Sequence, residues 1–296
     1  MDTGKQVKSR EDIVIAIILY PLLILLTISI VLPFWTLLVD SLSTPDGVRR
    51  LGFHFWPDRF NFEAYTEVLK QRNIGRAYVN TITRTVLGTF LVVMVSFCAG
   101  FALSRRKLPF RRTITVLIVF TMFFGGGLIP YYLLIRSLGM LDTFWVLIIP
   151  GLFSGFYILI VRNFLMAIPD ELEESALIDG ANEMTIAFRI FLPLSGPVIA
   201  TVAIFEAVHQ WNEWFGAMIF TRSQELQVMQ LLLRRILLEN QLNALMEIDD
   251  PSIAANLTPE SVRAALIFVA IGPIIAVYPF VQKYFVTGIT AGAVKG

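Results

Sequence analysis

The chain has 296 residues, of which 56% are hydrophobic and only 16% are charged. A soluble globular domain has about 45–50% apolar and about 25% charged residues, so this composition, with its apolar residues in long blocks, indicates an integral membrane protein. The net charge of +1 gives no sign of a nucleic-acid partner. The single cysteine, Cys98, excludes an intrachain disulfide framework and a multi-cysteine metal site, and we expect it to be a small packing residue.

Six apolar stretches are long enough to cross a bilayer, since a spanning helix needs about 20 mostly apolar residues. They cover residues 13–39, 79–103, 113–135, 144–165, 194–220 and 264–285. The sequence therefore predicts an all-α integral membrane fold with about six transmembrane helices, organised as a single transmembrane domain over residues 1–296. An even number of spans places both termini on the same side.

Basic residues indicate which side faces the cytoplasm. The tail before the first span is basic, and the tight connection after the second span holds Arg105, Arg106 and Lys107. We expect both to be cytoplasmic, with both termini. The long outer segment 40–78 also carries arginines, against this rule, but long loops follow it less strictly. In the second outer segment, 221–263, the amphipathic run 231–245 predicts a short helix on the membrane or on a partner, with a solvated connector as the equal alternative.

Residues 166–193, here called the hairpin segment, connect the fourth and fifth expected spans. Pro169 and Asp170 predict a helix start, with Asp170 as the N-cap and acidic residues in the first turn. Gly180 permits a sharp turn, and a second short helix is expected over 184–191. Pro193 is expected to stop that helix and to redirect the chain into the fifth span.

The first helix of the hairpin segment has an acidic face with small residues. Glu171 and Glu174 lie one turn apart on the same side, and Ser175 and Ala176 are small enough to let another surface approach. This pattern predicts a rigid helix–turn–helix on the cytoplasmic side that inserts into a cleft of a partner protein. The alternative is an ordinary interfacial loop with a solvated acidic face, which composition alone slightly favours.

The hairpin segment resembles the EAA coupling motif of ABC importer permeases, whose pattern is E-A-A, three residues, G, nine residues, I, one residue, L-P. Here the matching run is Glu174-Ser-Ala, Gly180, Ile190 and Leu192-Pro193, and the one departure is Ser175 in place of an alanine. The stretch 211–214 and the ending 282–296 resemble maltose-type carbohydrate permeases. Residues 124–130 and 138–145 resemble the branch associated with large or acidic oligosaccharides, such as pectin- and alginate-derived uronides.

The resemblance implies that the hairpin segment docks into a groove on an ATP-binding subunit and transmits its closure to the spans. The implied coupling residues are Glu171, Glu174, Ser175, Ala176, Asp179, Gly180, Ile190, Leu192 and Pro193. It further implies a multi-pass protein of the bacterial inner membrane that imports oligosaccharides by alternating access. The implied partners are a second homologous permease subunit in a heterodimer, two ATP-binding subunits and an external solute-binding protein.

The sequence has no G-x-x-x-x-G-K-[ST] phosphate-binding loop, so ATP and Mg²⁺ are expected on the partner ATPase and no cofactor on this chain. Its two histidines lack a metal-ligand pattern, and no catalytic constellation is present. We therefore expect a transport subunit and not an enzyme. An ion-driven secondary transporter is the alternative from another class, and a same-fold ABC permease for another solute, such as peptides, is the third.

Candidate solute-path residues lie in the fifth span, where Trp211, Asn212 and Trp214 follow Glu206, and polar residues in a span usually face a bundle interior or a water-filled path. Hydrogen bonding to the paired permease is the equal alternative for Asn212. Glycines 125–127 and Pro130 predict an interrupted third span, and Tyr131 and Tyr132 after it are further candidates. A kink that serves close packing has at least equal weight there. We expect Arg84 to pair with a carboxylate across the bundle.

Overall fold

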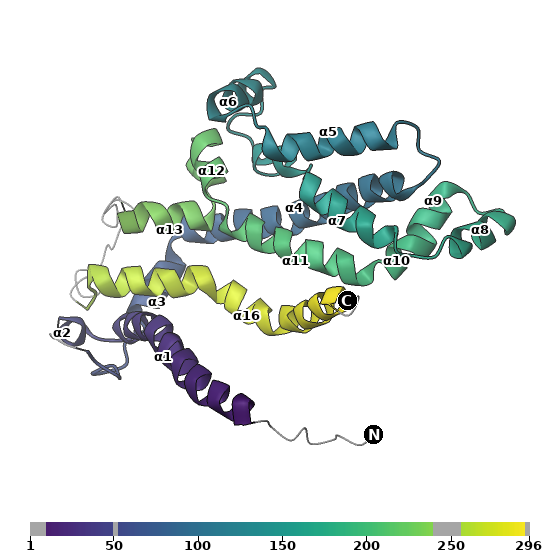
Figure 1. The fold of residues 1–296 in the computed structure, drawn as a ribbon. Coiled ribbons are helices and arrows are strands. Elements are labelled where there is room, and N and C mark those ends of the chain that lie inside the picture. The colour runs from purple at the N-terminus through teal and green to yellow at the C-terminus, as the bar shows by residue number, and fades with distance from the viewer. Residues whose placement is uncertain (1–9, 50–52, 239–255, 294–296) are drawn as a thin grey trace. The chain divides into compact units, whose positions relative to one another are not determined.

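The computed structural model describes residues 10–49, 53–238 and 256–293, and every regular element in these ranges is a helix, which confirms the all-α prediction (Figure 1). The helices are α1 (Arg10–Ser41), α2 (Pro45–Val48), α3 (Glu63–Lys70), α4 (Arg72–Ser104), α5 (Arg111–Phe123), α6 (Leu128–Ser137), η1 (Phe144–Leu147), η2 (Ile149–Gly151), α7 (Gly155–Leu165), α8 (Glu171–Ile178), α9 (Glu183–Thr185), η3 (Ile186–Phe191), α10 (Leu192–Leu194), α11 (Gly196–Asn212), α12 (Phe215–Phe220), η4 (Gln224–Leu226), α13 (Met229–Leu238) and α16 (Pro259–Ala293). The chain divides into two compact units, residues 1–70 with 241–269 and residues 71–240 with 270–296.

The first unit is built on α1, and polar contacts fold the following segment back onto the end of this helix. The Ser41 hydroxyl is hydrogen-bonded to the Tyr65 hydroxyl over 2.8 Å. The Asp58 carboxylate accepts both the amide and the hydroxyl of Thr44, at 3.2 and 2.5 Å. The described parts of the segment that follows α1 are therefore tethered to the end of this helix.

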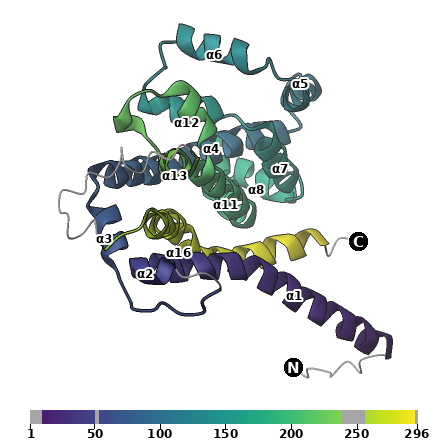
Figure 2. The same ribbon diagram turned by 90° about the vertical axis from the view of Figure 1, so that its left-hand side faces the viewer.

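The second unit is organised around α4, which packs most extensively against α7 and α11. Figures 1 and 2 show these three helices side by side. The approach of α4 to α7 is closest at Gly100, where a Cβ would lie 2.9 Å from Val161 Cγ1 and 3.1 Å from the Arg162 backbone nitrogen. Small residues allow this kind of close approach between membrane helices.

Three helical stretches of the described chain are long and apolar enough to cross a membrane: Ile15–Ser41, Arg72–Ser104 and Pro259–Ala276. Three bent pairs pass the same test: Arg111–Phe123 with Leu128–Ser137, Phe144–Gly151 with Gly155–Leu165, and Glu183–Leu194 with Gly196–Asn212. Counting each bent pair once gives six candidate spans within the described residues, the number expected.

The third span is interrupted, as its glycines predicted. Its two helices, α5 and α6, differ in direction by 113° across a break of a few residues. Gly127 has φ +83°, a left-handed conformation that L side chains rarely adopt, so the glycine permits the chain to turn at this point.

The expected boundary of the second span is wrong at its start, because α4 begins at Arg72 and not at residue 79. The polar first turns of α4 are held by a later segment of the same unit. Arg76 Nη1 donates to Glu225 Oε1 at 3.0 Å, and the Asn80 side-chain amide donates to the carbonyls of Glu225 and Gln227. These long-range contacts stabilise the first turns of α4, which hydropathy alone does not predict to be part of the span.

Two further expectations in the second unit are corrected. The fifth span was expected over 194–220, but α11 ends at Asn212 and the short α12 follows separately. The amphipathic run forms α13 up to Leu238, while its remainder lies outside the described residues. The predicted short helix is therefore present in this part, and its apolar face is buried against its own unit, where α13 contacts α4 and α12, so it is not a solvated connector.

Cys98 is exposed on α4, so within this chain it is not the small packing residue that was predicted. Apolar surface on a membrane helix needs no protein neighbour, because lipid tails are equally apolar.

Candidate functional site

The hairpin segment projects at one end of the second unit, with α8 and α9 beyond the ends of α7 and α11 (Figure 1). The chain runs from α8 through a turn into α9, continues without interruption through the π-helix η3 and α10, and then bends by 78° into α11. The predicted helix–turn–helix is therefore present.

The hairpin segment has a first arm, α8 with its N-cap Asp170, and a second arm, the continuous helix α9–η3–α10. Gly180 forms the turn between these two arms, as predicted, with φ +80°. Its amide donates to the Leu177 carbonyl at 3.0 Å, and the next amide, of Ala181, donates to the Ala176 carbonyl at 2.9 Å. This pair of bonds is the Schellman arrangement that ends helices at a left-handed glycine. No described residue lies within 4 Å of a Cβ placed on Gly180, so the turn requires glycine for its backbone conformation and not for space.

The prediction that Asp170 caps α8 with its side chain is wrong. Its backbone carbonyl accepts the amides of Glu173 and Glu174, but its carboxylate is turned to Arg106, 3.1 Å away. The second arm has the cap that the first lacks, since Asn182 Oδ1 accepts the Thr185 amide at 2.8 Å. Asparagine is among the residues favoured at an N-cap.

The acidic face of α8 is open to solvent, as expected. Glu171, Glu174, Ser175 and Asp179 are all exposed. Ala176 differs from the expectation, because it is only 7% exposed and packs inside the segment. It therefore holds the two arms together and does not present a surface to a partner.

The tip of the hairpin segment also exposes apolar side chains that sequence reasoning missed. Ile178 is 86% exposed and Met184 is 66% exposed, and Leu177 lies next to the turn with 39% exposure. Large apolar side chains gathered at an exposed point mark interaction surfaces more often than isolated ones do. The tip thus combines carboxylates with apolar side chains.

The base of the hairpin segment is anchored in a core shared with α4. Ile186 and Phe191 are almost fully buried and belong to one cluster with Phe97 and Phe101 of α4. Half-buried side chains of Ile190 and Leu192 pack against that cluster. The anchor residues of the second arm therefore fix it to the bundle and leave the first arm projecting.

Pro193 does not end the second arm, contrary to the prediction. Helix continues through Leu194, and the chain bends at Ser195, which leads into α11. Ser195 is fully buried, and its hydroxyl donates to the Phe191 carbonyl at 2.6 Å. Pro193 lies in the last turn of this continuous helix, so its missing amide hydrogen removes a helical bond only where the helix is about to end.

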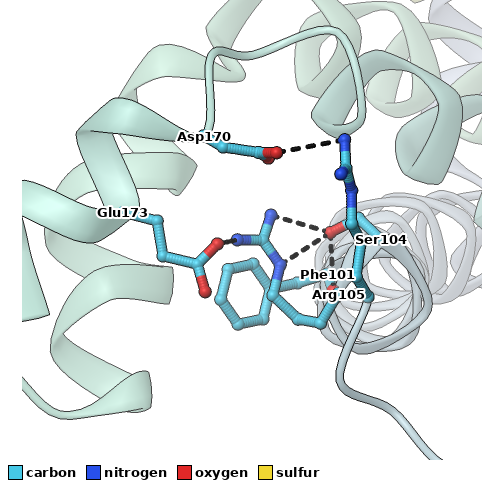
Figure 3. A network of polar contacts seen from close by, with 6 residues as sticks. Phe101, Ser104, Arg105, Asp170 and Glu173 are labelled. Atoms are coloured by element: carbon cyan, nitrogen blue, oxygen red, sulfur yellow. Dashed lines mark hydrogen bonds and ion pairs between the residues drawn. The ribbon is translucent and has the colours of Figure 1, made fainter.

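Two arginines at the end of α4 contact the first arm, and the sequence did not reveal this pairing (Figure 3). Arg105 Nη1 donates to Glu173 Oε2, and its other nitrogens donate to the Ser104 hydroxyl. Arg106 pairs with Asp170. Both basic residues were noted only as markers of the cytoplasmic side.

A buried polar chain connects α4 and α11 within the same unit. Arg84 Nε donates to Gln210 Oε1 at 2.8 Å, and Gln210 Nε2 donates to Glu206 Oε1 at 2.7 Å. Arg84 Nη1 also donates to the backbone carbonyl of Glu213 at 2.8 Å, just beyond the end of α11. All three interacting side chains are 3% exposed. Arg84 was expected to pair with a carboxylate across the bundle, and within the described residues it is linked to the Glu206 carboxylate through Gln210.

Gly88 provides the room for this polar chain. A Cβ at Gly88 would lie 2.9 Å from Gln210 Nε2, closer than real Cβ contacts come. Because residue 88 of α4 is glycine, the Gln210 side chain of α11 can pass close to the α4 backbone and accept the bond from Arg84.

The three aromatic and amide candidates of the fifth span have different surroundings. Trp211 is 7% exposed and packs edge to face on Tyr78, and its indole N–H has no hydrogen-bond partner among the described residues. Asn212 is exposed, and its amide donates to the Val208 carbonyl of its own helix. Trp214 is half-buried beneath the Arg234 guanidinium, 3.7 Å from its ring centre.

Tyr131 and Tyr132 pack on Phe220 of α12, edge to face and stacked respectively. Tyr132 and Phe220 also line a cavity of about 380 Å³, together with Arg136, Leu141, Asp142, Ile219 and Arg222. Asp142 ties this region together. Its amide donates to the Phe220 carbonyl, and its carboxylate accepts the amides of Arg222 and Ser223 at 2.8 and 2.9 Å. These backbone amides hold the pKa of Asp142 below its usual range.

Comparison with known proteins places these features in a family context. Residues 64–291 match the family described as "Binding-protein-dependent transport system inner membrane component". The Bacillus subtilis polygalacturonan/rhamnogalacturonan transport system permease protein YtcP is 37% identical over 94% of this chain and 97% of its own. Protein LplC of the same organism is 38% identical over 90% of each chain.

Solved structures agree. A chain from the crystal structure of a bacterial ABC transporter involved in the import of the acidic polysaccharide alginate has a TM-score of 0.88 and 32% identity, over 95% of this chain and 100% of that one. A second chain, from a bacterial alginate ABC transporter in complex with an alginate pentasaccharide-bound periplasmic protein, has a TM-score of 0.56 and 16% identity, over 92% and 94%. The second likeness concerns the fold alone.

Proposed function

The chain belongs to the family of binding-protein-dependent transport system inner membrane components, and from this membership we propose that it is one permease subunit of an ATP-driven ABC importer for oligosaccharides. Two partner subunits hydrolyse the ATP and bind it with Mg²⁺, and this chain binds no cofactor of its own. An external solute-binding protein delivers the oligosaccharide to the outer side, and alternating access carries it to the cytoplasm.

The hairpin segment is the element that docks on an ATPase subunit. The observation that carries this proposal is the contrast between its tip and its base. The tip exposes Glu174, Ile178 and Met184, while the base is fixed by Phe191 in the core shared with α4. A surface of this kind suits a partner's groove that covers the apolar side chains and offers positive charge to the carboxylates.

The second permease subunit covers part of the apolar surface that this chain leaves open. In the Ile15–Ser41 span, no residue of the most apolar stretch is buried within this chain. Helices α5 and α6 also expose most of their large apolar side chains. Lipid covers some of this surface. A homologous subunit that contributes a similar set of spans supplies the other half of the path, as in transporters built from paired repeats.

The contacts at the two ends of α4 support the proposed orientation. The basic connection after α4 meets the hairpin segment through Arg105 and Arg106. At the opposite end, Arg76 and Asn80 meet the segment around Glu225, which was expected outside. The segments expected in the cytoplasm therefore lie at one end of the second unit, and the segment expected outside lies at the other end. Both termini are cytoplasmic in this account.

The proposed solute is an oligosaccharide of uronides, as the names of the relatives suggest for their own solutes. Trp211 is the side chain best suited to contact it, because its ring lies against Tyr78 and its buried indole N–H is unpartnered among the described residues. A solute hydroxyl would satisfy that donor. Asn212, Trp214, Glu206, Tyr131 and Tyr132 remain proposed contributors to the path.

The test is reconstitution of this chain with its second permease and the ATPase in proteoliposomes, with the external binding protein added. Oligogalacturonate and alginate oligosaccharides are compared with a neutral maltooligosaccharide. The proposal predicts ATP-dependent uptake of an acidic oligosaccharide that requires the binding protein. Uptake driven by an ion gradient without the ATPase would contradict it and support a secondary transporter, and ATP-driven uptake of peptides alone would contradict the assigned solute.

A further inference from the structure

We infer that Arg105 is a positioning residue for energy coupling: it clamps the first arm of the hairpin segment to the end of α4, so that movement of α8 is transmitted to α4. This inference rests on the proposed docking function. It adds a polar link from the first arm to α4, beside the apolar core that joins the second arm to α4, whereas the covalent ends of the hairpin segment lead only to α7 and α11.

The Arg105 guanidinium is held on several sides. Its Nη1 donates to Glu173 Oε2, and its Nε and Nη2 donate to the Ser104 hydroxyl at 3.0 and 2.9 Å. The Arg105 Cζ atom lies 4.6 Å from the centre of the Phe101 ring and 4.4 Å from the centre of the Phe191 ring. The Arg105 and Glu173 side chains are only 13% and 18% exposed. A charge-assisted bond in so sheltered a place fixes geometry far better than a solvated pair.

The contacts of Arg105 join α4 to two elements of the hairpin segment, which is distant from α4 in sequence. Phe101 and Ser104 belong to α4, Glu173 to α8 and Phe191 to η3. Glu173 is 68 residues from Arg105, so no short stretch of backbone replaces this connection. Figure 3 shows the arginine reaching from the end of α4 to the first turns of α8.

The helix that receives this contact also carries the buried polar chain. Arg84 lies on α4, about 30 Å from Arg105 at about 1.5 Å of rise per residue. It bonds Gln210 in α11 and the Glu213 carbonyl just after that helix, beside Trp211. A shift of α4 produced at Arg105 therefore acts on the groups proposed to line the solute path.

Arg106 provides a matched control within the same turn. It also pairs with the first arm, through Asp170 at 3.1 Å, but the two side chains are 83% and 60% exposed. Exposed ion pairs contribute little, because water and salt screen them and both side chains lose freedom. Removing Arg106 changes the charge of the connection as much as removing Arg105 does, without removing the clamp.

The experiment uses the reconstituted transporter with Arg105→Ala, Arg105→Lys, Glu173→Gln and Arg106→Ala. Two quantities are measured: the solute imported per ATP hydrolysed, and hydrogen exchange of the α8 amides. For Arg105→Ala we expect exchange in α8 to rise by about tenfold or more, the factor for losing a hydrogen bond to a charged group, and import per ATP to fall severalfold. Arg106→Ala should match the wild type in both.

Arg105→Lys should lie between these results, because lysine keeps the charge but lacks the planar fork that bonds Ser104 and Glu173 together. If Arg105→Ala does not accumulate as folded protein, Arg105→Lys and Glu173→Gln decide the question by the same two measurements. Wild-type import per ATP in both of them would overturn the inference, as would equal effects of Arg105→Ala and Arg106→Ala. Failure of the proposed function is distinguishable, because the wild-type chain itself would then show no ATP-coupled import.

Discussion

The Ala181 amide donates to the Ala176 carbonyl over 2.9 Å and closes the first arm of the hairpin segment onto the start of the second. This bond forms because Gly180, between them, has φ +80°. The direction in which α8 projects is therefore set by one backbone conformation. A residue that avoids the left-handed region would change that direction, although its Cβ would meet no described residue within 4 Å.

Gly180→Val should uncouple ATP hydrolysis from import, whereas Gly180→Asn should largely preserve coupling. Valine in the left-handed region costs about 1–2 kcal/mol, while asparagine is tolerated there. The measurement is solute imported per ATP in proteoliposomes, at matched amounts of assembled transporter. Equal coupling in both variants would show that the turn does not set the docking geometry.

Gly100→Val should destabilise the second unit, because the added side chain meets Val161 and the Arg162 backbone, and backbone cannot move aside as a flexible side chain can. We expect a loss of about 1–3 kcal/mol, the usual cost of overpacking. Gly75→Ala, on the same helix with no atom of the described chain within 4 Å of the new Cβ, is the control and should be neutral or slightly stabilising. Thermal unfolding in detergent measures both, and equal melting temperatures would refute the close approach of α4 and α7.

Asp142 should make the contact between its loop and the end of α12 dependent on pH. Backbone amides lower its pKa in the folded protein, so its stabilising effect is present above the ordinary value of about 3.9 and is lost as pH falls through the lowered value. The hydrogen-exchange rates of the Arg222 and Ser223 amides, corrected for the intrinsic effect of pH, should therefore rise as pH falls through the lowered pKa of Asp142. Asp142→Asn keeps an acceptor and tolerates its φ of +57°, and should abolish this dependence. An unchanged pH profile in Asp142→Asn would contradict the assignment.

The proposed sidedness predicts which introduced cysteines are reachable from outside. In a Cys98→Ser background, Lys107→Cys lies in the connection after α4 and Gln224→Cys lies at the other end of the unit, and both positions are exposed. A membrane-impermeant maleimide added to intact spheroplasts should label Gln224→Cys and leave Lys107→Cys unlabelled until the membrane is opened. The reverse pattern would invert the topology.

Sequence reasoning succeeded where the signal is local. Apolar blocks predicted where spans lie, and glycine at 127 and 180 predicted turns, because a left-handed backbone excludes most other residues. It failed where one segment depends on a distant one. The early start of α4 depends on contacts of Arg76 and Asn80 with residues near 225, and these pairings leave no pattern in the local sequence.

In the hairpin segment, too, local features were predicted from the sequence and long-range contacts were not. Its motif predicted the turn and the exposed acids, but Ala176 lies inside, and Asp170 pairs with Arg106 instead of capping α8. The role of Arg105 was missed because its partners are spread over three elements. The spacing of Phe101 and Arg105, one turn apart at the end of a span, was the only local sign that this arginine lies against an aromatic ring.

The most direct test of the central claim is copurification of the partner ATPase with tagged permease in detergent. Wild type is compared with Glu174→Lys and Gly180→Arg in the hairpin segment, and with Glu225→Lys as a charge reversal at the other end of the unit, where the exposed Glu225 side chain pairs with Arg76. The account predicts that wild type and Glu225→Lys retain the ATPase and that both hairpin variants lose it. A wild-type chain that retains no ATPase, or hairpin variants that retain as much as wild type, would contradict it.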